Sequence, residues 1–117
     1  MEVPRLYIKK MIRHYGQTVP IKKRKVLIDE QGNAFYVYEQ DEPVRGHFNQ
    51  ITPTDEAIQR WGRYIECDCI GTFLPDTNIE EGDQLFINGA WYEVVNKVVR
   101  STKGKADFIE VLLRRRG

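Results

Sequence analysis

The sequence predicts an all-β protein, a small antiparallel β-barrel with a short N-terminal helix. The pair Asn88-Gly89 stands between two apolar, β-rich runs, and a two-residue type I′ hairpin needs the positive φ that Asn and Gly tolerate best. Short runs rich in β-branched and aromatic residues recur along the chain, separated by turn residues. The length of 117 residues, with 41% hydrophobic and 30% charged residues, fits one globular domain over residues 1–117.

The first element is predicted to be a helix over Pro4–Tyr15. Its apolar side chains recur at helical spacing, and lysine and arginine occupy the positions between them. Gly16 follows in the usual capping position. We expect the apolar face of this helix to lie against a sheet.

A strand is predicted over Thr18–Ile28, with Pro20 assigning its first part to a sheet edge. Turn residues 29–33 lead into a second strand, Ala34–Tyr38, which is aromatic and β-branched. The polar segment Glu39–Asn49 contains a proline and a glycine. It is predicted to be a long exposed loop, the kind of segment that carries function on a rigid scaffold.

The second half is predicted to be mainly strand. One helical turn is expected near residues 54–60, because Thr54 can cap it and acidic residues follow. Pro75–Asn78 is turn chemistry. The predicted strands are Arg63–Leu74, Gln84–Asn88, Trp91–Ser101 and Ala106–Arg114.

The charges nearly balance, with 18 Lys and Arg against 17 Asp and Glu and a formal net charge of +1. This balance argues against a dedicated nucleic-acid binder. The charges are nevertheless clustered: residues 22–25 and 114–116 are basic, whereas 29–30, 41–42 and 80–83 are acidic. Each cluster can be an ordinary solvated loop, or it can serve self-association or docking onto a charged partner.

No catalytic residue set is recognisable. Ser101 is the only serine and lacks a glycine-flanked nucleophile motif. The two histidines, His14 and His47, offer little material for a general base. We therefore expect a protein that is not an enzyme and needs no cofactor.

Cys67 and Cys69 alternate along a predicted strand, so both thiols can face one side. A structural zinc needs four ligands, and the chain has only these cysteines and two histidines. We expect both cysteines to pack in the core, with no metal site and no disulfide framework. We see no signal peptide and no membrane-length apolar run, which predicts a cytoplasmic protein.

A small barrel that binds single-stranded nucleic acid is the alternative function. Trp61, Arg63 and Tyr64 form an aromatic and basic cluster, and Arg114–Arg116 could contact phosphates. Such barrels stack bases on aromatic side chains along a basic groove.

Several short elements occur in a characteristic order: Gly16 after the helix, the strand Val19–Lys22, Asp29-x-x-Gly32, Ile51-Thr52-Pro53, Gly62-Arg63, Ile79-x-x-Gly82-Asp83 and Asn88-Gly89-x-x-Tyr92-x-Val94. In order and spacing the chain resembles the phage head–tail connector family, the head-closure or stopper proteins of tailed phages and defective prophages of Gram-positive bacteria. It departs from the family at Glu66–Cys69, where a polar, often basic, run is usual.

The resemblance implies a structural role without catalysis or cofactor. Such proteins assemble as a homo-oligomeric ring beneath the portal and adaptor proteins after DNA packaging, close the channel and dock the tail. The expected partners are therefore portal, adaptor and tail proteins, with packaged DNA only nearby and no membrane. The expected location is the neck of the virion, or the bacterial cytoplasm before assembly. An interaction module on the tail side or elsewhere would share the same fold.

Two groups of residues are candidates for these contacts. The predicted loop offers Asp41, Glu42, Arg45 and His47 to the channel or a partner; the acids would repel DNA phosphates and the other two would attract them. Between neighbouring subunits of a ring, the candidate contacts are basic residues on one side and acidic residues on the other: Lys22, Lys23 and Lys25 against Glu80, Glu81 and Asp83.

Overall fold

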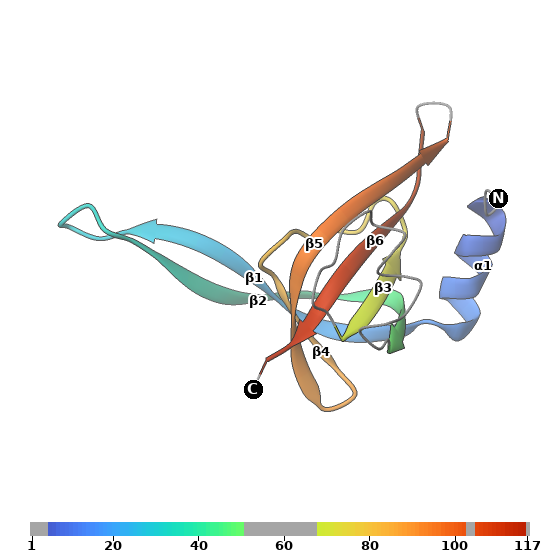
Figure 1. Ribbon diagram of the computed structural model, residues 1–117, viewed down its shortest axis with the longest axis horizontal. Coiled ribbons are helices and arrows are strands. Elements are labelled where there is room, and N and C mark those ends of the chain that lie inside the picture. The colour runs from blue at the N-terminus through green and yellow to red at the C-terminus, as the bar shows by residue number, and fades with distance from the viewer. Residues whose placement is uncertain (1–4, 51–67, 103–104, 117) are drawn as a thin grey trace.

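Six antiparallel strands close into a barrel in the order β1-β2-β3-β6-β5-β4, with one short helix at its side (Figure 1). The computed structural model describes residues 5–50, 68–102 and 105–116. The elements are α1 (Arg5–Tyr15), β1 (Gln17–Ile28), β2 (Ala34–Gln50), β3 (Cys69–Phe73), β4 (Gln84–Ile87), β5 (Ala90–Thr102) and β6 (Lys105–Arg115). The predicted fold class is confirmed.

Helix α1 forms where the apolar spacing predicts a helix. Ile8 and Ile12 are buried and the helix contacts β2 and β6, whereas Tyr15, expected on the apolar face, is 79% exposed. Gly16 ends it by donating its N–H to the Ile12 carbonyl at 3.0 Å.

The barrel interior is filled by side chains, as expected for a barrel of this size. β2 contributes the nearly buried Val44, and the fully buried residues come from the other five strands and the turn before β4; they include Ile21, Phe73, Ile79, Leu85, Ile87, Val94, Val111 and Leu113. Cys69 is part of this core, as predicted. Cys67 lies outside the described residues.

The hairpin between β4 and β5 turns at Asn88 and Gly89, with φ of 48° and 86°. Both values are positive, as a type I′ turn requires. Ile87 and Ala90 face each other across it. The hairpin read from the sequence is therefore confirmed.

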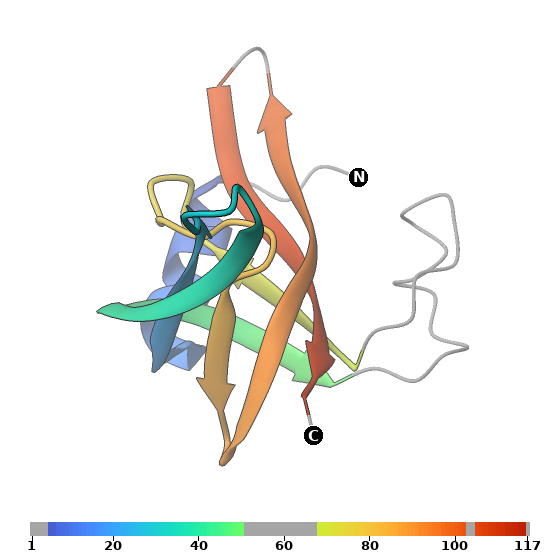
Figure 2. The same ribbon diagram turned by 90° about the vertical axis from the view of Figure 1, so that its left-hand side faces the viewer.

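Strands β1 and β2 run on beyond the barrel as a two-stranded ribbon (Figures 1 and 2). Among the described residues, β1 pairs with β4 only at Ile21 and Lys22, and β2 pairs with β3 only from Gly46 onward. We call residues 23–39 the arm. It projects to one side of a molecule whose principal extents are 51 × 32 × 30 Å.

The predicted loop over Glu39–Asn49 is wrong, because these residues belong to β2. The polar run stays extended because β1 pairs with it as far as Gly46. The proline, Pro43, is tolerated because it lies on a strand edge next to an irregularity in the pairing.

The helical turn predicted near residues 54–60 lies outside the described residues. So does the start of the predicted strand Arg63–Leu74. The end of that strand is confirmed as β3. None of the helices in the described part of the chain is both long and apolar enough to cross a membrane.

Candidate assembly surface: the arm and its base

The arm exposes apolar side chains on both of its faces. Residues directly opposite in an antiparallel pair share a face. On one face Val26 lies opposite Tyr36, each 58% exposed, and Ile28 follows at 71%. On the other face Leu27 lies opposite Phe35, at 45% and 44%. The described strands of the barrel cover neither face.

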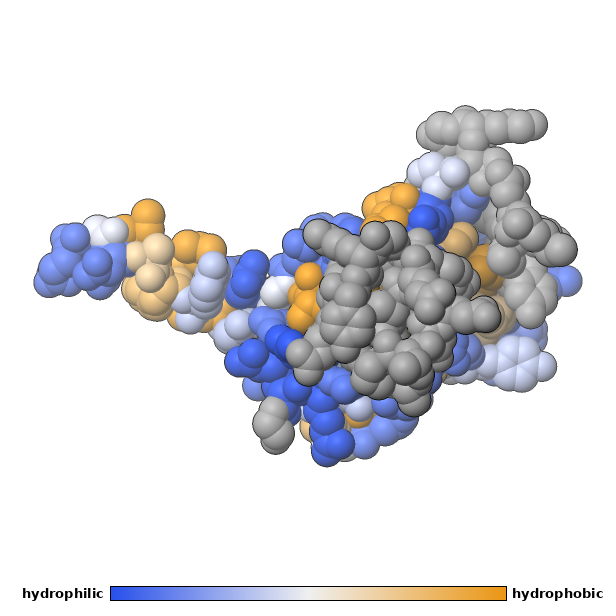
Figure 3. Space-filling model, viewed as in Figure 1, coloured by the Kyte–Doolittle hydropathy of each residue, from blue (hydrophilic) through white to orange (hydrophobic). Residues whose placement is uncertain are grey.

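The exposed area is large for a protein of this size. Six large apolar side chains of the arm are exposed: Val26, Leu27, Ile28, Phe35, Tyr36 and Tyr38. At about 100 Å² each they present roughly 600 Å² in total, divided between the two faces of the ribbon. Figure 3 shows this apolar band between a hydrophilic tip and a hydrophilic base. Because a two-stranded ribbon alone is marginally stable in water, this pattern is typical of a surface that a partner covers.

A buried carboxylate fixes the base of the arm to the barrel. Asp83 is 1% exposed and accepts hydrogen bonds from three donors: the Lys23 ammonium, the Arg24 N–H at 3.0 Å and the Glu80 N–H at 2.9 Å. The first two lie on β1 where it leaves the barrel. Asp83 therefore sets the direction in which the arm projects.

The preceding glycine makes room for the Arg24 side chain beside this carboxylate. Gly82 has φ of +92°, and a Cβ placed there would lie 2.2 Å from the guanidinium carbon of Arg24. That guanidinium also stacks on the Tyr36 ring, 4.5 Å from its centroid. The motif Gly82-Asp83 thus connects the barrel to the apolar face of the arm.

On the outer part of the arm, Lys25 and Glu39 form an exposed ion pair at 2.5 Å. The hydrogen bond to Glu39, followed by the charge of that carboxylate, raises the pKa of Lys25 above its ordinary value. Both side chains remain more than half exposed.

The structure brings the predicted inter-subunit residues together within one chain. Lys23 and Asp83 pair with each other within the chain, and the Asp83 carboxylate is buried. The contact between subunits stays a prediction. The others also have partners in the same chain. Lys22 lies over the Trp91 ring at 4.4 Å, and Glu80 and Glu81 accept hydrogen bonds from Lys97, at 3.0 and 3.3 Å respectively.

The four residues assigned to the predicted loop separate into two pairs. Asp41 and Glu42 are exposed on β2. His47 is half-buried opposite Thr72 of β3. Arg45 donates hydrogen bonds to carbonyls at the end of α1, those of Ile12 at 3.1 Å and Arg13 at 2.8 Å, which is a favourable place for a cation.

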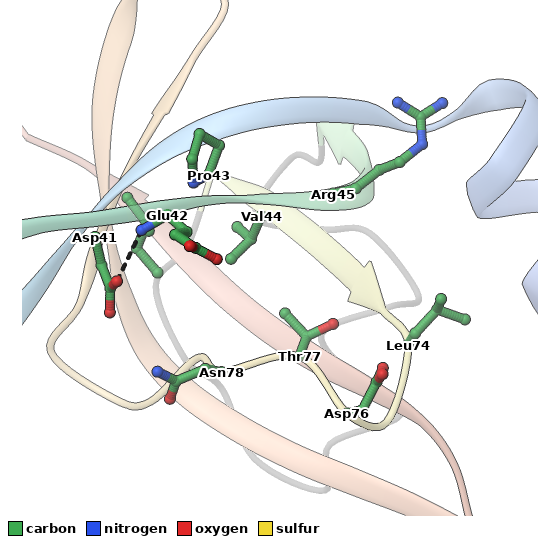
Figure 4. Close-up of a pocket in the computed structure, with 10 residues that line it drawn as sticks. Asp41, Glu42, Pro43, Val44, Arg45, Leu74, Asp76, Thr77 and Asn78 are labelled. Carbon is green, nitrogen blue, oxygen red and sulfur yellow. Dashed lines mark hydrogen bonds between the residues drawn. The ribbon is translucent and has the colours of Figure 1, made fainter.

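Asp41 and Glu42 border a groove of about 320 Å³ beside the base of the arm (Figure 4). The opposite wall is the turn after β3, including Asp76, and apolar lining comes from Val44 and Leu74. In Figure 4 the Arg45 side chain points away from the groove, toward α1. An acidic rim over an apolar lining can receive a lysine or arginine side chain of a partner. Among the described residues, no three His, Cys, Asp or Glu side chains are grouped as a metal site requires.

The residues of the nucleic-acid alternative are described only in part. Trp61, Arg63 and Tyr64 lie outside the described residues. Arg116 pairs with Glu93 at 3.2 Å, which leaves it less available to phosphates. A different aromatic pair, half-buried Phe86 and Trp91 with ring centroids 5.1 Å apart, lies on β4 and β5.

Sequence reasoning missed the arm, although the signal was present. Val26-Leu27-Ile28 and Phe35–Tyr38 are continuous apolar runs on either side of a turn, without the alternation of a strand that has one face in water. Such a hairpin exposes apolar side chains unless both of its faces are covered. It reaches beyond the barrel, so the described residues of the chain leave both faces exposed.

No protein-family model matches this chain, and comparison with curated proteins finds none that is significantly similar.

Proposed function

We propose that this protein is a structural subunit of a phage or prophage head–tail connector, which closes the DNA channel after packaging and docks the tail. The observation that carries the proposal is the apolar arm projecting from a rigid closed barrel. Barrel and arm together suit a structural subunit of an assembly, because the barrel supplies a fixed shape and the arm supplies contact area. The order of sequence elements shared with connector proteins adds to this support.

The base of the arm fits the same role. Asp83 fixes the arm's direction, so little conformational freedom is lost when a partner covers it. The acid-rimmed groove beside it, bordered by Asp41 and Glu42, offers a second contact for a basic side chain of a portal, adaptor or tail protein.

The test is to shorten the arm in the phage or prophage that encodes the chain. Replacing residues 26–36 by Asn-Gly joins Lys25 to Val37, which face each other across the ribbon, through a two-residue turn. We expect a folded barrel by circular dichroism, and heads that lose their DNA or fail to join tails by electron microscopy. Wild-type chain supplied in trans should restore joined particles.

A tip substitution, Gln31→Ser, is the matched control, because Gln31 is exposed and outside the apolar band. It should leave particle assembly unchanged. Full, tailed, infectious particles made with the shortened arm would refute the proposal.

Single-strand nucleic-acid binding is the second candidate, favoured by Trp91 and Phe86 with the Lys22 ammonium over the indole ring. It predicts micromolar or tighter affinity for an oligonucleotide, falling steeply as salt is raised. The connector predicts little binding by the free chain. A fluorescence titration at two salt concentrations separates them.

A further inference from the structure

The arm has two unpaired strand edges. Among the described residues, β1 beyond Lys22 and β2 before Gly46 each pair only with the other. An unpaired edge presents backbone N–H and C=O groups to any extended strand that approaches it. Because the two edges lie on opposite sides of the ribbon, one arm can accept a strand on each side.

The hydrogen bond to Asp83 shows which backbone groups point outward. The Arg24 N–H is donated to the Asp83 carboxylate, away from β2. Backbone groups alternate along a strand, so those of Val26 and Ile28 also point outward. Their partners across the ribbon, Tyr36 and Ala34, point outward on the other edge for the same reason.

The two edges carry opposite charge near the base of the arm. Lys25 lies on β1 and Glu39 on β2, and each side chain stays more than half exposed although the two pair within the chain. A β1 edge is therefore attracted to a β2 edge, while two β1 edges or two β2 edges repel. This favours head-to-tail contacts over symmetric ones.

We propose that the arm binds the arm of a second copy of this chain, with the β1 edge of one copy pairing antiparallel to the β2 edge of the next. When the two arms pair without a shift in register, Val26 of one copy lies opposite Tyr36 of its neighbour. The outward N–H and C=O groups of these residues then form hydrogen bonds between the copies. The contact is heterologous, so repetition gives a ring if the rotation closes. This inference rests on the proposed function only for where the ring forms. The contact between the two arms does not depend on it.

Charge exchange provides the first test, measured by sedimentation velocity up to millimolar protein. The wild-type chain should associate as its concentration rises. Lys25→Glu and Glu39→Lys should each stay monomeric, because each makes the two edges alike at this position. An equimolar mixture should associate again, since positions 25 and 39 of neighbouring copies, which are diagonal neighbours on one face, then carry opposite charges at every contact between the two variants.

Recovery in the mixture is an outcome that a folding defect cannot produce. A mixture that sediments like its separate components overturns the proposal. A wild-type chain that stays monomeric at millimolar concentration also overturns the proposal.

A proline provides the second test. Val26→Pro removes an outward N–H and keeps the hydrogen bonds within the arm, as is usual for proline on an edge strand. We expect the melting temperature to be kept and association to be lost. Val26→Thr, which keeps both the N–H and the branched shape, should associate like wild type. Association by Val26→Pro equal to wild type contradicts the proposal.

The two proposals fail separately. A monomeric chain whose arm is still required for particle assembly would overturn edge pairing and leave the connector function, with a different protein covering the arm. A chain that associates through its arm without being needed for particles would keep edge pairing and remove the connector function.

Discussion

Asp83 and Arg45 are charged residues whose known contacts lie within the chain. Asp83 holds the base of the arm, and Arg45 holds the end of α1. The sequence suggested partner contacts for both because it shows their charge, and it shows neither the burial of Asp83 nor the contact of Arg45 with α1. Asp83 meets Arg24 across 59 positions of the chain, a contact that no local pattern encodes.

Replacing Asp83 by Ala should lower the free energy of unfolding by roughly 2–4 kcal/mol, because it leaves the Lys23 ammonium and two backbone N–H groups without their acceptor. Urea unfolding measures this. Asp76→Ala, at an exposed turn position, should stay within about 0.5 kcal/mol of wild type. Equal effects of the two substitutions would show that Asp83 is not an anchor.

Replacing Arg45 by Ala should loosen α1, because the carbonyls of Ile12 and Arg13 lose a charged donor. We expect a cost of about 1–3 kcal/mol, concentrated in the helix. Amide exchange should speed up in α1 more than in β5. Arg13→Ala, which removes only an exposed side chain and keeps that carbonyl, should have a smaller effect; an equal effect would contradict the capping role.

At the scale of elements, local chemistry predicted most of the fold. Helical spacing and Gly16 defined α1, and Asn88-Gly89 defined the β4–β5 hairpin. The prediction failed over Glu39–Asn49, where a polar run with a proline is typical of a loop. That run is extended because β1 pairs with it, and pairing outweighs local propensity.

The ion pair on the arm gives a prediction about pH. The pKa of Lys25 is raised, chiefly by its hydrogen bond to Glu39. The stabilisation is therefore fully present below the ordinary lysine pKa of 10.5 and is lost as the pH rises through the raised value. An NMR titration of the Lys25 Cε should show the raised pKa, and Glu39→Gln should return it toward the ordinary value. No change in that variant would contradict the pairing.

At the scale of the whole molecule, the fold class was predictable and the shape was not. Alternating runs and turns indicated a barrel. Closure depends on β1 meeting β4 at Ile21 and Leu85, positions far apart in the sequence. The arm exists because β1 stops pairing with β4 after Lys22, and β2 begins pairing with β3 only at Gly46. These limits depend on the register of four strands rather than on any one segment.

We propose that the apolar arm is covered by a partner when the protein is assembled. Amide hydrogen exchange over residues 25–38, compared between the free chain and particles that contain it, tests this most directly. We expect much slower exchange of the arm in the particle, with little change in β5. Equally fast exchange of the arm in both states would contradict it.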